Sequence, residues 1–147
     1  MIFHVVEIDG ASFTADGRLK VAQEPPAPPP ATTPIEFGGI EVVGGAPVDS
    51  VHVIGTGKVL VIQNLSGGAA PIMSGSKVEL YDDPNGNGVG MTLLRVAYVN
   101  GASFSLDLGR ELGPGNGTHA VRLRRASLGG ASREVAAFLA GYERAAP

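Results

Sequence analysis

The feature that most constrains the fold of this chain is a proline-rich tract close to its N-terminus. Residues 24–34 read E-P-P-A-P-P-P-A-T-T-P and hold six of the 11 prolines. Proline fixes φ and lacks a backbone N–H group, so such a run favours extended polyproline II and acts as a semi-rigid spacer. The sequence therefore predicts an N-terminal arm over residues 1–23, a Pro-rich linker over residues 24–37 and a β domain over residues 38–147.

The arm has the pattern of a small β-hairpin. Residues 3–8 are rich in β-forming side chains, Asp16-Gly17 is a turn dipeptide, and residues 18–22 alternate between polar and apolar. A two-stranded ribbon by itself is marginally stable in water. We therefore expect the arm to pack against its own domain or against another subunit. The candidate contact residues in the arm and linker are Phe3, Val5, Ile8, Pro28, Pro29 and Pro30.

The residues after the linker consist of short apolar runs separated by glycine-rich turns. Residues 102–108 (A-S-F-S-L-D-L) alternate most regularly, which predicts that Phe104, Leu106 and Leu108 point into a core. Strands recur about every 10–14 residues, and no long helical segment interrupts them. The sequence therefore predicts an all-β fold, an antiparallel jelly-roll-like β-sandwich.

The C-terminal segment over residues 133–144 is compatible with two structures. Its V-A-A-F-L-A run satisfies a helix by propensity, whereas its length and the preceding Gly129-Gly130 turn fit a final strand. Helix propensity is a weak guide where tertiary contacts compete with it. The strand is the favoured prediction.

Composition excludes several classes of function. The chain of 147 residues has a net charge of -3, which argues against nucleic acid as a partner, because phosphate binding needs a basic surface. It has no cysteine, which removes disulfides and zinc-thiolate sites. No apolar run reaches the ~20 residues that span a bilayer, so no membrane contact is expected. Residues 1–7 lack the basic and apolar regions of a signal peptide.

One segment resembles the start of a calcium-binding loop. Residues 83–88 read D-P-N-G-N-G, which makes Asp83, Asn85 and Asn87 candidate oxygen ligands. The motif requires a glutamate at its twelfth position, and that position is Leu94. The two Asn-Gly pairs also suit the tip of a polar hairpin, which is the favoured interpretation.

No arrangement of residues in the sequence indicates catalysis. The three histidines, His4, His52 and His119, are far apart and lie in strand-like runs. No nucleophile elbow and no H-x-H or H-E-x-x-H pair is present. The sequence therefore predicts a protein that is not an enzyme and needs no cofactor.

A basic cluster lies near the C-terminal end and is formed by Arg122, Arg124 and Arg125, with Arg133 nearby. Alternation places Arg122 and Arg124 on the same face of a strand. Two interpretations remain open for this face. It is either solvated or makes ionic contacts with an acidic neighbouring subunit, for which arginine is well suited.

The order and style of the segments from residue 58 to residue 142 resemble a loose group of small bacteriophage β-sandwich proteins. The resemblance rests on K-V-L-V-I-Q-N-L-S, K-V-E-L-Y-D-D with a glycine-rich tip, T-L-L-R-V-A, A-S-F-S-L-D-L-G and G-N-G-T-H-A-V-R-L. Proteins of this group decorate capsids or form head and tail appendages, commonly as trimers. The arm and the linker are not part of the resemblance.

The resemblance implies a structural component of a virion, made in the cytoplasm of the host bacterium. We expect a capsid decoration (cement) protein, a homotrimer that binds the major capsid protein or another virion protein. A head-fibre or tail-fibre module that binds a receptor is the alternative within the same class. A small β-sandwich lectin or hydrolase is the alternative from another class.

Overall fold

The computed structural model describes residues 31–71 and 75–147 in full, and before them the backbone of two short strands. These strands, β1 (Ser12–Phe13) and β2 (Leu19–Lys20), pair antiparallel. The predicted strand over residues 3–8 lies outside the described residues, as do the candidate contacts Phe3, Val5, Ile8, Pro28, Pro29 and Pro30.

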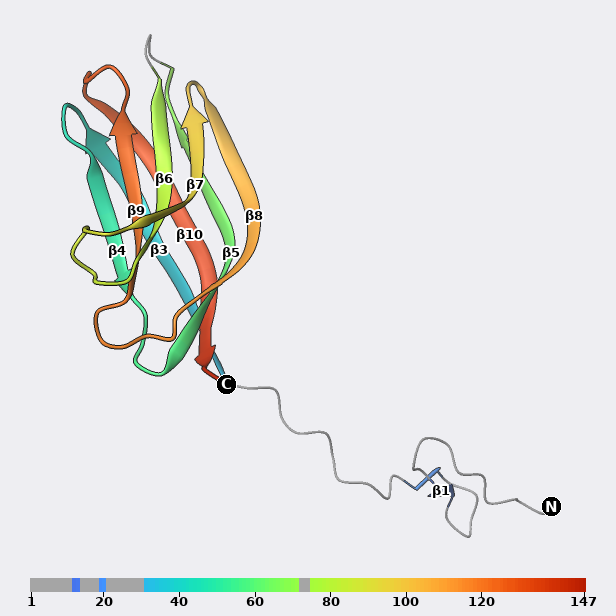
Figure 1. The fold of residues 1–147 in the computed structure, drawn as a ribbon. Helices are drawn as coiled ribbons and strands as arrows, with labels where there is room; N and C mark the ends of the chain where they lie inside the picture. The colour runs from blue at the N-terminus through green and yellow to red at the C-terminus, as the bar shows by residue number, and fades with distance from the viewer. Residues whose placement is uncertain (1–11, 14–18, 21–30, 72–74) are drawn as a thin grey trace.

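The described residues from 31 onward form a sandwich of two four-stranded sheets, in which every paired strand is antiparallel (Figure 1). The first sheet has the order β3-β10-β5-β8, and the second has the order β4-β9-β6-β7. The chain passes between the sheets several times, as in a jelly roll, which confirms the predicted fold class. The strand bounds are β3 (Thr32–Val43), β4 (Val48–Val53), β5 (Lys58–Ala69), β6 (Ser76–Asp83), β7 (Thr92–Val99), β8 (Ala102–Leu112), β9 (Ala120–Ser127) and β10 (Arg133–Ala145).

A single apolar core fills the space between the two sheets. Leu60, Ile62, Leu80, Leu123 and Leu139 are fully buried there and come from strands of both sheets. Phe104, Leu106 and Leu108 of β8 pack against this core, which confirms their predicted inward face. β8 lies at an edge of its sheet, and these three side chains are therefore only partly buried.

The C-terminal segment is the strand β10, as favoured from the sequence. It pairs with β3 on one side and with β5 on the other, so it lies in the interior of the first sheet. Val135, Ala137 and Leu139 face the core. A segment with helical propensity is a strand here because its pairing on both sides and its three buried side chains outweigh that weak propensity.

The first strand of the sandwich begins earlier than the sequence predicted. β3 starts at Thr32, six residues before residue 38, and includes Pro34. Because β3 is an edge strand, a residue without an N–H group is tolerated there. Thr32 lies opposite Arg144 of β10, so the chain enters the sandwich at the end where it also leaves it (Figure 1).

A buried arginine connects the two sheets. Arg125 of β9 is fully buried and donates hydrogen bonds to the carbonyl oxygens of Gly39, at 3.2 Å, and Ala137, at 3.2 Å, in the first sheet. It also donates to Ser50 Oγ at 3.0 Å in β4. A carbonyl of a regular strand lies in the plane of its sheet, so contact with the core requires an irregular backbone. Gly38 and Gly39 supply it, with φ of 117° and 149°.

Candidate docking surface

The outer face of the second sheet carries a network of charges that neutralise one another. Arg122 of β9 donates to Asp83 Oδ2 from Nη2 at 2.8 Å and to Asp49 Oδ2 from Nη1 at 3.0 Å. Arg124 donates to both oxygens of Asp49, at 2.8 and 2.9 Å, and its guanidinium lies over the ring of Tyr81. Both arginines are therefore bound within their own chain.

This network bears on whether the arginines of the basic cluster are free to contact an acidic neighbouring subunit. Arg122 and Arg124 do share a strand face, but their charges are already compensated by Asp49 and Asp83. Arg125, the third candidate, is inside the sandwich and is fully buried. A contact with an acidic neighbour would have to compete with these internal ion pairs.

Arg133, at the start of β10, is different from the other three arginines. It is 7% exposed, and none of its three guanidinium nitrogens has a hydrogen-bond partner among the described residues. The same holds for the hydroxyl of Ser76, at the start of β6. Both strands begin at the end of the sandwich opposite Thr32, so two uncompensated polar groups are buried near that end.

The segment that resembled a calcium loop forms a turn around the carboxylate of Asp83. Asp83 is fully buried, and its Oδ2 accepts hydrogen bonds from Gly88 N at 2.9 Å and from Nε and Nη2 of Arg122. Asn87 Oδ1 accepts from Val89 N at 3.0 Å, and Asn85 Nδ2 donates to Val89 O at 3.4 Å. A guanidinium therefore supplies the positive charge beside Asp83, and the asparagines support the turn.

The hydrogen bonds of the network lower the pKa of both aspartates. The hydrogen bond from Arg124 holds the pKa of Asp49 below its usual value of 3.8; burial opposes this effect, and Arg122 reinforces it. Burial of Asp83 alone would raise its pKa, but the hydrogen bonds from Arg122 and the Gly88 N–H outweigh burial, so the pKa is lowered. Both side chains are therefore ionised carboxylates at neutral pH.

We expect these shifts to appear as a loss of stability in acid. A carboxylate with a lowered pKa stabilises the folded chain fully above its unfolded value of 3.8, and this contribution is lost as the pH falls through the folded pKa. Asp49→Asn should therefore lower the melting temperature at pH 6 and make its decline below about pH 4 shallower than in the wild type. Thermal melts from pH 7 to pH 2 measure both slopes, and equal slopes would contradict the assignment.

The two described histidines form pairs with carboxylates. His119 Nε2 lies 2.5 Å from Asp82 Oδ1, and His52 Nε2 lies 2.8 Å from Glu143 Oε1. Glu143 also accepts a hydrogen bond from Gly55 N at 3.1 Å, and the His52 ring stacks on Phe37. The first pair links the residue before β9 to β6, and the second joins β4 to β10. No group of three or more His, Asp or Glu side chains that could hold a metal occurs within the part of the chain that the structure describes.

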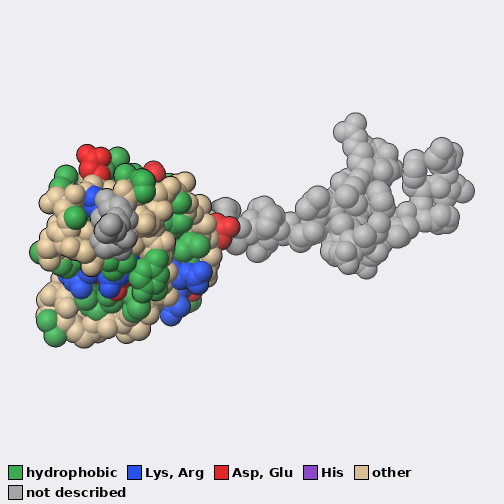
Figure 2. Space-filling model, turned by 90° about the horizontal axis from the view of Figure 1, so that it is seen from above, with side chains coloured by type: hydrophobic (Ala, Val, Ile, Leu, Met, Phe, Trp, Pro, Cys, Tyr) green, Lys and Arg blue, Asp and Glu red, His purple; other side chains and the backbone are tan. Residues whose placement is uncertain are grey.

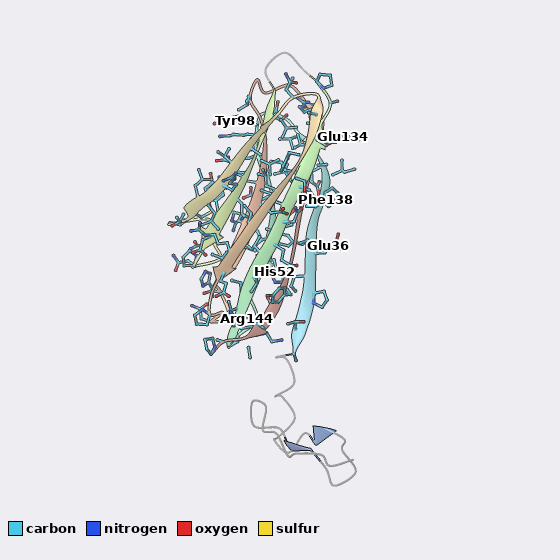
Figure 3. The ribbon with its side chains drawn as sticks, turned by 90° about the vertical axis from the view of Figure 1, so that its right-hand side faces the viewer. Glu36, His52, Tyr98, Glu134, Phe138 and Arg144 are labelled. Atoms are coloured by element: carbon cyan, nitrogen blue, oxygen red, sulfur yellow. The ribbon has the colours of Figure 1, made fainter. Side chains whose placement is uncertain are left out.

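The outer face of the first sheet has a different chemistry. The outward residues of β10 alternate with its buried ones, and Ala136 and Phe138 lie at the centre of the face. Ile40, Val42 and Phe138 are 61%, 64% and 38% exposed. Figure 3 shows Phe138 and Glu134 on this side of the sandwich and Tyr98 of β7 on the other. The centre of the face is therefore apolar and open to solvent, in contrast to the ionic face of the second sheet.

A shallow hollow of about 260 Å³ opens beside these exposed side chains. Its lining is mainly apolar and comes from three adjacent strands and the residue after β5: Ile40, Gly68, Ala69, Ala70, Glu134 and Ala136. The hollow exists because the residues in the row across β10 and β5 are small. Ile40, Ala136 and Gly68 are paired in that row, and Gly68 has no side chain to fill it. We call the outer face of the first sheet, with this hollow, the apolar face.

The apolar face is not among the features predicted from the sequence, although the sequences of β3 and β10 contain a signal for it. β3 and β10 lack the clean alternation of a strand with one solvated side, because Ile40, Val42 and Phe138 occupy outward positions. Such a departure indicates either a bulge or a covered outer face. Viewed from above, most of the surface of the described sandwich is uncharged or hydrophobic, and Lys and Arg side chains gather in patches among these residues (Figure 2).

Comparison with known proteins leaves the family of the chain open. No protein-family model matches the chain, and no curated protein matches it. Among solved structures, the crystal structure of the Yersinia pseudotuberculosis-derived mitogen (YPM) is similar at a TM-score of 0.32 and 9% identity, and the match covers 71% of this chain and 86% of that one. A similarity of this size carries no argument about function. No helix among the described residues could span a membrane.

Proposed function

We propose that this chain is a structural protein of a bacteriophage virion, which associates with itself and binds a larger assembly. The single observation that supports it best is the apolar face. A chain that works alone in water gains nothing from exposing Ile40, Val42 and Phe138 together, and contiguous exposed apolar surface is typical of a protein interaction site. The bacteriophage part of the proposal rests on the resemblance of residues 58–142.

The roles that we assign to the two parts of the chain differ. The sandwich provides the rigid body and the contact between copies, which the resemblance predicts to be a trimer. The arm and linker provide the contact with the major capsid protein or another virion protein. A subunit that binds only the assembled shell shifts the equilibrium toward assembly, which is how a decoration protein stabilises a capsid.

The entry point of the chain suits this division. Residues before Thr32 join the sandwich at the end where β10 finishes, whereas the hollow is lined by residues toward the opposite end of the sheet. The arm is therefore attached away from the hollow. Contact with a shell through the arm leaves the hollow end free for other contacts.

The test is attachment to particles. We expect the full chain to co-sediment with capsids of the bacteriophage that encodes it, and a chain that begins at Ala31 to lose this binding with an unchanged melting temperature. The structure sets this boundary, because a longer deletion would remove residues of β3. The proposal is wrong if particles purified from infected cells lack the protein. Binding to tails instead of heads would favour the fibre alternative, and turnover of a glycan or ester would favour the enzyme.

A further inference from the structure

The apolar face has a shape that is complementary to itself. Its bulky side chains, Val42, Ile40 and Phe138, stand on β3 and β10. Small outward residues lie beside them, on the parts of β5 and β8 nearest the hollow. Pairing across these strands places Gly68 opposite Ser103, and Ser66 opposite Ser105. The face is therefore low around Gly68 and projects at the neighbouring Ile40 and Phe138.

The projecting and the recessed features are adjacent. Phe138 is paired with Gly38 on one side and with Ser66 on the other, so its ring stands between two small residues. Two residues earlier on the same strand, Ala136 lies in the row that lines the hollow. Successive outward residues of a strand are about 7 Å apart. The ring and the hollow are thus neighbours on the same strand.

We infer that a second copy of this chain docks on the apolar face, with the two sheets face to face about a two-fold axis that lies between them and crosses the strands between Ala136 and Phe138. This rotation places Phe138 of each copy over the hollow of the other. Because the rows of Ala136 and Phe138 are exchanged, it also places Ile40 of each copy over Gly38 of the other. Two-fold contacts of this kind use one surface twice and are the commonest among homo-oligomers.

The charges on the face are compatible with this arrangement. Glu134 is at the rim of the hollow, Glu36 lies along β3, and Asp107 lies on β8, so the carboxylates surround the apolar centre. Because the axis passes between Ala136 and Phe138, the rotation moves each Glu134 away from its own counterpart. An apolar centre with a polar rim is the usual composition of a protein interface.

The size of the face is sufficient for a specific dimer. Four strands about 4.8 Å apart and about 30 Å long cover about 600 Å² on each copy. The pair would bury about 1,200 Å² in total, which is at the lower limit of specific interfaces. The inference rests on the self-association in the proposed function, and not on attachment to a virion. It replaces the three-fold contact implied by the resemblance with a two-fold contact.

The experiment compares matched aromatic residues on the two outer faces. We expect sedimentation equilibrium of the full chain, from about 1 to about 100 µM, to show a monomer–dimer equilibrium. Phe138→Asp should shift it to monomer, because a carboxylate would be buried in an apolar hollow. Tyr98→Asp, on the opposite face and 72% exposed, should leave the dimer unchanged. Circular dichroism verifies that both variants are folded.

A cross-linking experiment tests the axis itself and does not depend on the stability of Phe138→Asp. The chain has no cysteine, so a single introduced thiol reports one position. Ala136→Cys lies next to the proposed axis and should give covalent dimers with a short bis-maleimide, whereas Tyr98→Cys should give few. A monomeric wild type at 100 µM, a trimer, or equal cross-linking of the two variants would overturn the inference. None of these results bears on whether the chain binds capsids.

Discussion

Replacing Asp83 with alanine should lower the free energy of unfolding by about 3–5 kcal/mol, the cost of breaking a buried ion pair. Asp83 is fully buried and its Oδ2 accepts hydrogen bonds from Gly88 N and from two nitrogens of Arg122. Without the carboxylate, the Gly88 N–H loses its acceptor, and Arg122 keeps Asp49 as its carboxylate partner. Urea denaturation of both chains measures the difference.

Two control variants show whether the loss comes from the buried ion pair. Asp107→Ala removes an exposed carboxylate whose hydrogen bond comes from Asn64, and it should cost no more than about 0.5 kcal/mol. The double variant Asp83→Ala/Arg122→Met should recover part of the loss, because it also removes the Nε and Nη2 donors that lose their acceptor in Asp83→Ala. A loss of less than about 1 kcal/mol in Asp83→Ala would show that the pair contributes little.

Asp83→Ala also tests whether the turn that begins at Asp83 binds calcium. Arg122 already supplies the positive charge beside Asp83, so added calcium should not raise the melting temperature of the wild type. A ligand that binds the folded state alone would raise it in proportion to the logarithm of its concentration. A calcium-dependent rise that disappears in Asp83→Ala would establish a metal site at the turn.

Replacing Arg133 with methionine should raise the free energy of unfolding by about 1–3 kcal/mol, the penalty of a buried polar group without a partner. The guanidinium of Arg133 is buried without a hydrogen-bond partner among the described residues, so the folded state bears the cost of removing a charge from water. Methionine has a similar length and adapts to irregular space. Most substitutions destabilise a protein, and an increase at this position would therefore be specific.

The matched variant is Arg125→Met, at a second buried arginine. Arg125 donates to Gly39 O, Ser50 Oγ and Ala137 O. Its removal leaves these buried acceptors without a donor. Each such acceptor should lower the free energy of unfolding by about 1–3 kcal/mol. Burial lowers the pKa of Arg125, and the carboxylates of Glu41 and Asp49 offset this only in part. Opposite signs for the two variants are the expected result. Loss of stability in both would mean that Arg133 is compensated in solution.

Structural features that depend on residues close together in the sequence agree with their predictions. Alternation in residues 102–108 identified the inward side of β8, because successive side chains of a strand always point to opposite faces. Turn residues and the spacing of apolar runs were sufficient for the class of fold. β3 begins before the predicted boundary, because Pro34 has the pattern of a linker residue and only the strand order shows that it lies in an edge strand.

The sequence by itself determined the β-sandwich and the failure of residues 83–94 to complete a calcium motif, because both follow from spacing along the chain. Pairing with β3 and β5 decided that the C-terminal segment, which also fits a helix, is a strand. The tertiary structure alone decided which charges meet. Arg122, Arg124 and Arg125 are close in sequence, yet two bind aspartates from other strands and the third crosses the core. It also decided that Ile40, Ala136 and Gly68, far apart in the chain, line one hollow. Strand pairing brings distant residues together, and no local pattern encodes the pairing partners.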